Sequence, residues 1–253
     1  MRTDGDVDTR EVPADPLLAF ARRLVGAQED GRGGGTELHG RVHHARLRVL
    51  GVPALLLFRP DPAEVRRRAE TGQPPILRMG ALEALMGLPL GEPVPERTLT
   101  ERERCLLRAA PHAALRRDGP DVVRLAAVPL RVEMVVVEAP TWRTALRRVG
   151  RFPPTSARVA VAGRPPKDGT VAACEADFYG IGLGARCDDG AAGDGGGDGG
   201  ARSVRPLVAP SPGLRRHTAV TWRFAELVLA GAEEAGVLAS AAPGAGPAPR
   251  PDP

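Results

Sequence analysis

Residues 131–230 constrain the fold of this chain more than any other stretch, because short apolar runs and amphipathic helices alternate there in a regular order. Four apolar runs have the length of buried strands: 131–137, 157–162, 181–187 and 203–208. Two helices are expected between or after them: 142–152 and 218–235. Such alternation is the pattern of a sheet covered by helices. The sequence therefore predicts an α/β core, with a mixed sheet flanked by helices.

The N-terminal part of the chain has a different pattern. A short amphipathic helix is expected around Leu17–Leu24, a strand-like stretch over 38–58, and a charged helix that Pro62 opens. Pro93 and Pro95 then mark the expected internal boundary.

We therefore expect an N-terminal α+β extension over 15–95 and an α/β core domain over 96–238. Within the core domain, Thr100 and Glu103 form a capping-box pattern that starts a helix through Arg108. Three segments are too poor in packing side chains to be ordered, and are expected to be a disordered N-terminus, a Gly/Asp-rich loop and a disordered tail: 1–14, 188–200 and 239–253.

Composition gives limited information about partners. The formal net charge is only +4 although the pI is about 9.6. Nearly every cation is an arginine, and Lys167 is the single lysine, as a GC-rich bacterial genome favours. The three cysteines lie far apart and form no CxxC pair, which indicates free thiols. With no apolar signal segment near the N-terminus, the sequence predicts a cytoplasmic protein and no membrane partner.

The order of elements in the core matches one nuclease superfamily. An apolar strand leads to Glu138, a helix opens at Trp142, an apolar strand follows at 157–162, and the Gly-rich segment 177–183 approaches a further strand. In this order, residues 120–208 resemble the PD-(D/E)xK (restriction-endonuclease-like) superfamily. The resemblance implies a restriction-endonuclease-like core fold.

The resemblance also implies a place for catalytic residues. A metal-dependent nuclease of this kind needs two acidic groups to hold a hard cation and a lysine to position the attacking water. Asp121 corresponds to the first acidic group, and Glu133 or Glu138 to the second. The lysine position then holds Val135 or Pro140. We therefore expect a degenerate site without a cofactor, and magnesium only if the chain is an active nuclease.

Arg143, Arg147 and Arg151 are spaced four apart, with no acidic partner in register. Such a row can bind the phosphates of a nucleic acid. It can equally be a solvated helix face in a chain that uses arginine for nearly every cation.

Other patterns resemble ligand sites without completing one. His39 and His43 have a helical metal-ligand spacing, and His44 follows, but the region reads as a strand and no third ligand stands nearby. The glycines at 180, 182 and 184 enter an expected strand, whereas a phosphate loop leaves one. We expect no metal site.

Three functions remain open from the sequence. The first is a non-catalytic nuclease-like core that acts in binding or assembly near nucleic acid. The second is an active metal-dependent phosphodiesterase, and the third is an accessory module that binds another protein. The sequence does not predict the oligomeric state.

Overall fold

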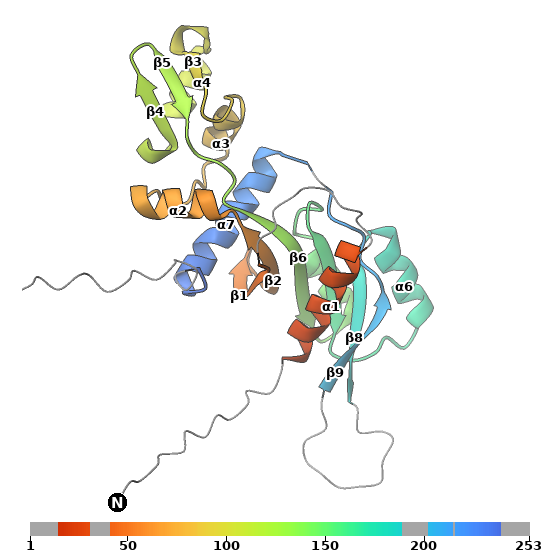
Figure 1. Cartoon of the computed structure of the whole chain (residues 1–253). Helices are drawn as coiled ribbons and strands as arrows, with labels where there is room; N and C mark the ends of the chain where they lie inside the picture. The colour runs from red at the N-terminus through yellow and green to blue at the C-terminus, as the bar shows by residue number, and fades with distance from the viewer. Residues whose placement is uncertain (1–14, 31–40, 189–201, 215, 239–253) are drawn as a thin grey trace, which may run out of the picture.

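The computed structural model describes residues 15–30, 41–188, 202–214 and 216–238 (Figure 1). The N-terminal and C-terminal segments expected to be disordered lie outside these residues, as does the Gly/Asp-rich segment after Asp188.

A mixed six-stranded sheet forms the centre of the molecule, in the order β1-β2-β6-β7-β8-β9. The strands are β1 (His43–Val49), β2 (Val52–Pro60), β6 (Leu130–Ala139), β7 (Ala157–Ala162), β8 (Gly182–Asp188) and β9 (Arg202–Val208). β6, β7 and β8 are parallel, and the remaining neighbours pair antiparallel. The four strands predicted between residues 131 and 208 are confirmed.

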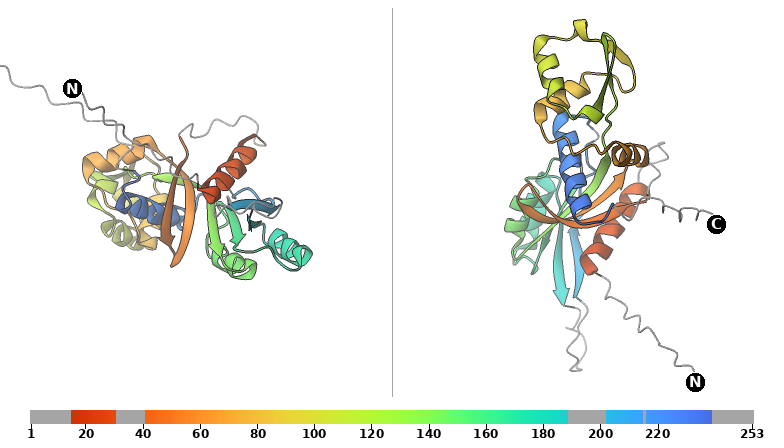
Figure 2. Two further views of the ribbon diagram at one scale, coloured as in Figure 1. Left: turned by 90° about the horizontal axis from the view of Figure 1, so that it is seen from below. Right: turned by 90° about the vertical axis from the view of Figure 1, so that its left-hand side faces the viewer.

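Helices cover both faces of this sheet (Figures 1 and 2). α5 (Trp142–Val149) connects β6 to β7, and α6 (Gly169–Phe178) connects β7 to β8, as parallel neighbours require. Together with α7 (Ala219–Glu234) they pack on one face, while α1 (Pro16–Asp30) packs on the other. α5 and α7 confirm the predicted helices, although α5 ends three residues earlier than expected.

The strands alternate their side chains between two hydrophobic cores. Leu56 and Val135 face the core under α5, α6 and α7, while Leu57 and Met134 face the core under α1. Phe20 of α1 packs against the sheet at Gly184. A Cβ on Gly184 would lie only 3.1 Å from the Phe20 ring, so a glycine there leaves room for the ring. The regular apolar alternation in the sequence thus supports a three-layer arrangement.

An insert between β2 and β6 forms a second, smaller unit, which stands above the main sheet in Figure 1. It contains a three-stranded antiparallel sheet in the order β3-β5-β4. Its elements are α2 (Pro62–Thr71), α3 (Met79–Met86), β3 (Pro93–Pro95), η1 (Glu96–Thr98), α4 (Glu101–Arg108), η2 (His112–Ala114), β4 (Leu115–Asp118) and β5 (Asp121–Arg124).

The insert corrects the domain boundary expected at residue 95. Pro93 and Pro95 lie within β3 and pair with β5, while β1 and β2 belong to the main sheet. The prolines are accommodated because β3 is a three-residue edge strand. The described residues within 15–60 and 130–238 therefore contribute to one sheet-and-helix body.

The capping box predicted at the start of α4 is confirmed. The Thr100 hydroxyl accepts a hydrogen bond from the Glu103 backbone N–H at 3.2 Å, and the Thr100 N–H donates to Glu103 Oε2 at 2.7 Å. This reciprocal pair is the predicted capping box at the start of α4.

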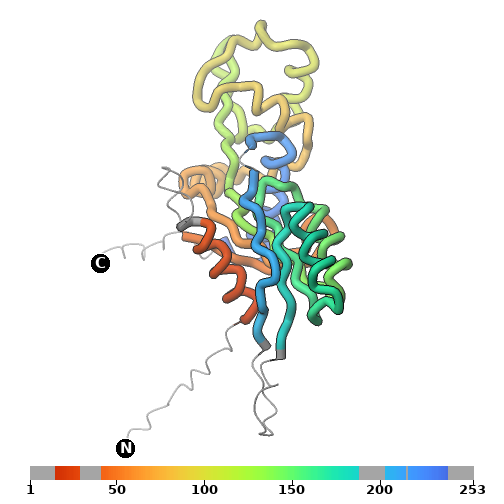
Figure 3. Tube along the Cα trace, turned by 90° about the vertical axis from the view of Figure 1, so that its right-hand side faces the viewer, coloured from red at the N-terminus to blue at the C-terminus, as the bar shows by residue number. Residues whose placement is uncertain are grey.

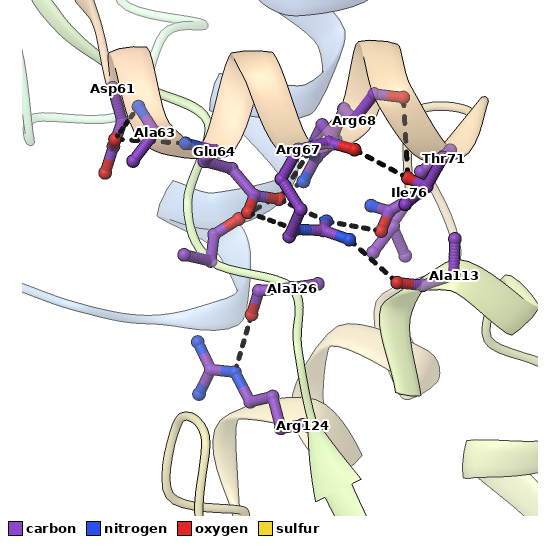
Figure 4. Close-up of polar contacts among 12 residues, drawn as sticks. Asp61, Ala63, Glu64, Arg67, Arg68, Thr71, Ile76, Ala113, Arg124 and Ala126 are labelled. Atoms are coloured by element: carbon purple, nitrogen blue, oxygen red, sulfur yellow. Dashed lines mark hydrogen bonds and ion pairs between the residues drawn. The ribbon is translucent and has the colours of Figure 1, made fainter. Parts of the chain in front are cut away.

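A buried ionic network joins the insert to the main body. Arg68 of α2 donates to both carboxylate oxygens of Glu226 of α7, at 2.7 Å each. Arg68 also donates to Glu64 Oε1 at 2.6 Å, and Figure 4 shows Glu64, Arg67 and Arg68 along α2. The Arg68 side chain is 3% exposed, and that of Glu226 is fully buried. Burial alone would raise the pKa of Glu64, but the hydrogen bonds from Arg67 and Arg68 outweigh it and hold this pKa below its ordinary value.

Glu226 also organises the side chains around the junction. It accepts hydrogen bonds from the Trp222 indole N–H at 2.8 Å and from the Ile76 backbone N–H at 2.9 Å. Arg124 of β5 lies over the Trp222 ring, 4.6 Å from its centroid. One carboxylate on α7 thus holds α2, α7 and the segment before α3 together.

We predict that Arg68→Met lowers the free energy of unfolding by about 3–5 kcal/mol, because it leaves the Glu226 carboxylate buried without its cationic partner. Chemical denaturation followed by circular dichroism measures this loss. Arg108→Met is the control: Arg108 forms an exposed ion pair with Glu101, so its loss should be much smaller. Equal losses in the two variants would contradict a stabilising role for the junction.

The β1–β2 hairpin turns at two residues with positive φ, Leu50 (φ 53°) and Gly51 (φ 75°). This is the pattern of a type I′ turn, which asparagine and glycine favour. Leu50 is 42% exposed, so it gains little burial in return for a strained conformation.

Leu50→Asn should therefore raise the free energy of unfolding by about 0.5–1 kcal/mol. Thermal or chemical denaturation measures the gain. Leu50→Ala removes the same apolar side chain without easing the backbone, so it should bring no gain. If both variants gain equally, exposure of the leucine side chain rather than backbone strain is responsible.

Candidate nucleic-acid interface

An arginine-lined cleft of about 690 Å³ lies beside α5 and α6. The two helices lie side by side on one face of the sheet, drawn in green and teal in Figure 3. The cleft is lined by Arg143, Leu146, Arg147, Gly150, Arg151, Arg158, Glu175, Tyr179 and Ile181. Four of these nine residues are arginines, so the cleft is strongly cationic.

Three of the arginines come from α5 and the turn that follows it. Trp142, Ala145, Leu146 and Val149 are buried on the inner stripe of α5 and fix the rotation of the helix. The row of Arg143 and Arg147 consequently lines the cleft. α5 ends at Val149, so Arg151 lies in the following turn rather than on the helix, yet it still lines the same cleft. The structure thus brings all three predicted arginines together.

The fourth arginine, Arg158, comes from β7 and was not anticipated from the sequence. Its Nη2 donates to the backbone carbonyl of Tyr179 at 2.9 Å, which ties the strand to the end of α6. Burial lowers the pKa of Arg158, but an arginine remains protonated at neutral pH. The available signal was a single charged residue in an otherwise apolar strand.

Few negative charges lie beside the cleft arginines. No ion pair in the described part of the chain includes any of the four, and Glu175 is the one acidic residue in the lining. Arg143 lies over the Trp142 ring, 4.5 Å from its centroid, which orients the guanidinium without cancelling its charge. Such a site can bind an anion with several charges.

A second cavity of about 520 Å³ lies in the insert, beside α4, η2 and β4. Its lining includes Arg108, His112 and Arg117, but also Glu96. Arg108 is already ion-paired with Glu101 at 3.2 Å. This cavity is therefore less cationic than the cleft beside α5 and α6.

The three candidate catalytic carboxylates lie in different surroundings. Asp121 is in β5 of the insert, where it pairs in register with Pro95 and Asp118. Glu133 and Glu138 lie on β6 of the main sheet, five residues apart. Asp121 is thus in a different sheet from both glutamates.

Arginines accompany both β6 carboxylates. Glu133 Oε1 accepts from Arg59 Nε at 3.2 Å and from Arg131 Nε at 2.7 Å. Glu138 accepts a bidentate pair from Arg186 of β8, at 2.7 and 2.9 Å. This pair raises the pKa of Arg186, chiefly through the hydrogen bond to Glu138. The carboxylates are therefore charge-compensated by protein cations.

The histidines of the N-terminal region do not form a cluster within the described residues. His43 stacks on Phe58, with ring centroids 6.1 Å apart, and His44 Nδ1 lies 3.4 Å from Arg22. Burial, as the largest cause, lowers the pKa of both imidazoles. His39 lies outside the described residues. Across the described ranges, no group of three or more His, Cys, Asp or Glu side chains is placed to hold a metal ion.

The remaining sequence patterns have structural explanations. Gly182 lies on β8, where a Cβ would come within 2.9 Å of Pro210, so close packing rather than a phosphate requires glycine there. The cysteines are free, with Cys105 and Cys174 exposed. Among the helices that the structure describes, none is long and apolar enough to cross a membrane.

Comparison with known proteins adds no family. The chain matches no protein-family model, no curated protein sequence and no solved structure.

Proposed function

We propose that this protein binds nucleic acid through the arginine cleft beside α5 and α6, and that its core does not cleave the bound strand. The observation that supports this most is the convergence of Arg143, Arg147, Arg151 and Arg158 on one cleft, with no ion pair to any of them among the described residues.

Physical chemistry favours a polyanion as the ligand. Like charges gathered in one cleft repel each other, and a bound phosphate group relieves that repulsion. Guanidinium groups match phosphate oxygens with paired N–H donors. Several arginines in one cleft suit a ligand that carries several phosphates, and a nucleic acid backbone is such a ligand.

The surroundings of the candidate carboxylates support the proposal that the core does not catalyse cleavage. The order β6, α5, β7 agrees with the resemblance to the PD-(D/E)xK superfamily, and we propose a degenerate version of that core. Glu133 and Glu138 are compensated by arginines, and Asp121 lies in the other sheet. Arginine can stabilise charge but cannot act as a base. The exposed free thiols of Cys105 and Cys174 suit a reducing cytoplasm, where we place this function.

Charge reversal at Arg147 tests the proposal. We expect Arg147→Glu to weaken binding of a fluorescein-labelled oligonucleotide by about tenfold and to reduce the salt dependence of its Kd, because one phosphate contact is lost. Fluorescence anisotropy over a range of salt concentrations measures both effects.

Arg148→Glu provides a matched control. Arg148 is the next residue on α5 and is exposed, but it does not line the cleft. The variant changes the net charge and the helix end in the same way, so its affinity should stay within about twofold of the unmodified protein. Equal losses at the two positions would show that only the overall charge matters.

We predict no cleavage of DNA or RNA by the purified protein with magnesium or manganese, because Val135 and Pro140 stand where the catalytic lysine would be and Arg186 is paired with Glu138. Gel electrophoresis of labelled single and double strands after incubation checks this. Metal-dependent cleavage that disappears in Glu138→Ala would contradict the prediction and assign the protein to active nucleases.

A further inference from the structure

Two aromatic side chains depart from the pattern of all the others. The chain has five phenylalanines, two tryptophans and one tyrosine. Six of these are buried in the cores: Phe20, Phe58, Phe152, Phe224, Trp142 and Trp222. Phe178 is 82% exposed and Tyr179 is 55% exposed. A chain with so few aromatics thus places two neighbouring rings in solvent, which folding does not explain.

The two rings are held on a fixed backbone. They are edge-to-face, with centroids 5.1 Å apart and an angle of 82° between the planes. α6 ends at Phe178 in a Schellman motif, in which the Gly180 N–H donates to Asp177 O and the Ile181 N–H to Ala176 O. Gly180 has the positive φ (61°) that this motif needs. The rings are consequently presented on a backbone fixed by these hydrogen bonds.

One residue of the ring pair, Tyr179, belongs to the arginine cleft, and Phe178 adjoins it through the ring contact. Tyr179 lines the cleft, and its backbone carbonyl accepts the hydrogen bond from Arg158. Phosphates next to the C-terminus of a helix are disfavoured by the helix dipole, and Arg158 offsets that charge here. The surface therefore places arginines that can contact a phosphate backbone beside the flat apolar faces of aromatic rings.

We propose that the ligand of this surface is a single-stranded nucleic acid, whose unpaired bases stack on Phe178 and Tyr179 while its phosphates contact the cleft arginines. This inference rests on the proposed function and specifies its ligand. Base stacking on aromatic side chains beside a cationic groove is a general mode of single-strand binding. In a duplex the base faces are already stacked on each other, so the rings have nothing to contact.

Three labelled probes separate phosphates from bases. They are a mixed-sequence DNA strand, the same strand annealed to its complement, and an abasic strand of equal length and charge. Fluorescence anisotropy should show the single strand bound most tightly, with the abasic strand about 5- to 100-fold weaker. Equal affinity for all three would overturn the inference but leave the proposed function intact. Absence of binding to any probe would overturn both.

Variants at Phe178 test the rings directly. Because Phe178 is exposed, Phe178→Ala should fold normally, yet it should weaken binding of the single strand by about 5-fold or more and leave the abasic strand unaffected. Phe178→Trp should retain binding, because it keeps an aromatic ring. Phe178→Leu should lose it, because leucine is apolar but has no ring on which a base can stack. Val171→Ala is the control for an exposed apolar residue elsewhere on α6.

The single tyrosine provides a second readout that does not depend on affinity. Incorporation of 3-fluorotyrosine labels Tyr179 alone, because no other tyrosine exists. The ¹⁹F resonance should shift on addition of the single strand and much less with the abasic strand at equal saturation. Equal shifts, or an unchanged affinity in both Phe178→Ala and Phe178→Leu, would show that the rings do not bind bases and serve another partner, such as a protein.

Discussion

The ion pair between Arg68 and Glu226 is the interaction on which the placement of the insert against the main body depends. It is fully withdrawn from water, so it is stable only while every partner is in place. Those partners come from α2, α7 and the segment before α3, which belong to two different units. A buried charge pair is a poor source of stability compared with apolar packing, but it tolerates few alternative geometries. A pair of this kind, beside the packing of Trp222 in the insert core, favours one orientation of the insert against α7.

The cleft lies beside a helix, α6, that buries only small side chains against the sheet. Its buried side chains are the alanines at 172 and 176, which bring the helix onto the sheet without filling the space toward α5. α5, by contrast, buries the large side chains of Trp142 and Leu146 against the sheet. Two neighbouring helices with inner faces of unequal size leave a gap between them, and arginines line it. The position of the cationic site thus follows from the packing of small and large residues.

Much of the main sheet could be predicted from the sequence, since β6 and β7 are largely apolar and α5 has a clear apolar stripe. α6 could not be predicted, because two alanines give almost no amphipathic signal. The insert could not be placed either, since the pairing of β2 with β6 links residues far apart in the chain. In the site, helical spacing indicated Arg143 and Arg147, but Arg158 and the arginine partners of Glu133 and Glu138 depend on register between strands.

The chain leaves the main sheet at Pro60 and returns at Leu130, and these two residues are directly paired. The sheet therefore cannot close until everything between them has been drawn together, which costs loop-closure entropy. The core of the insert comes from residues 76–126 and is completed by Trp222 of α7, so most of it can form early and shorten the effective distance between β2 and β6. Early formation of the insert would then speed assembly of the six-stranded sheet, and slow folding of this segment would leave the edges of β2 and β6 open to aggregation.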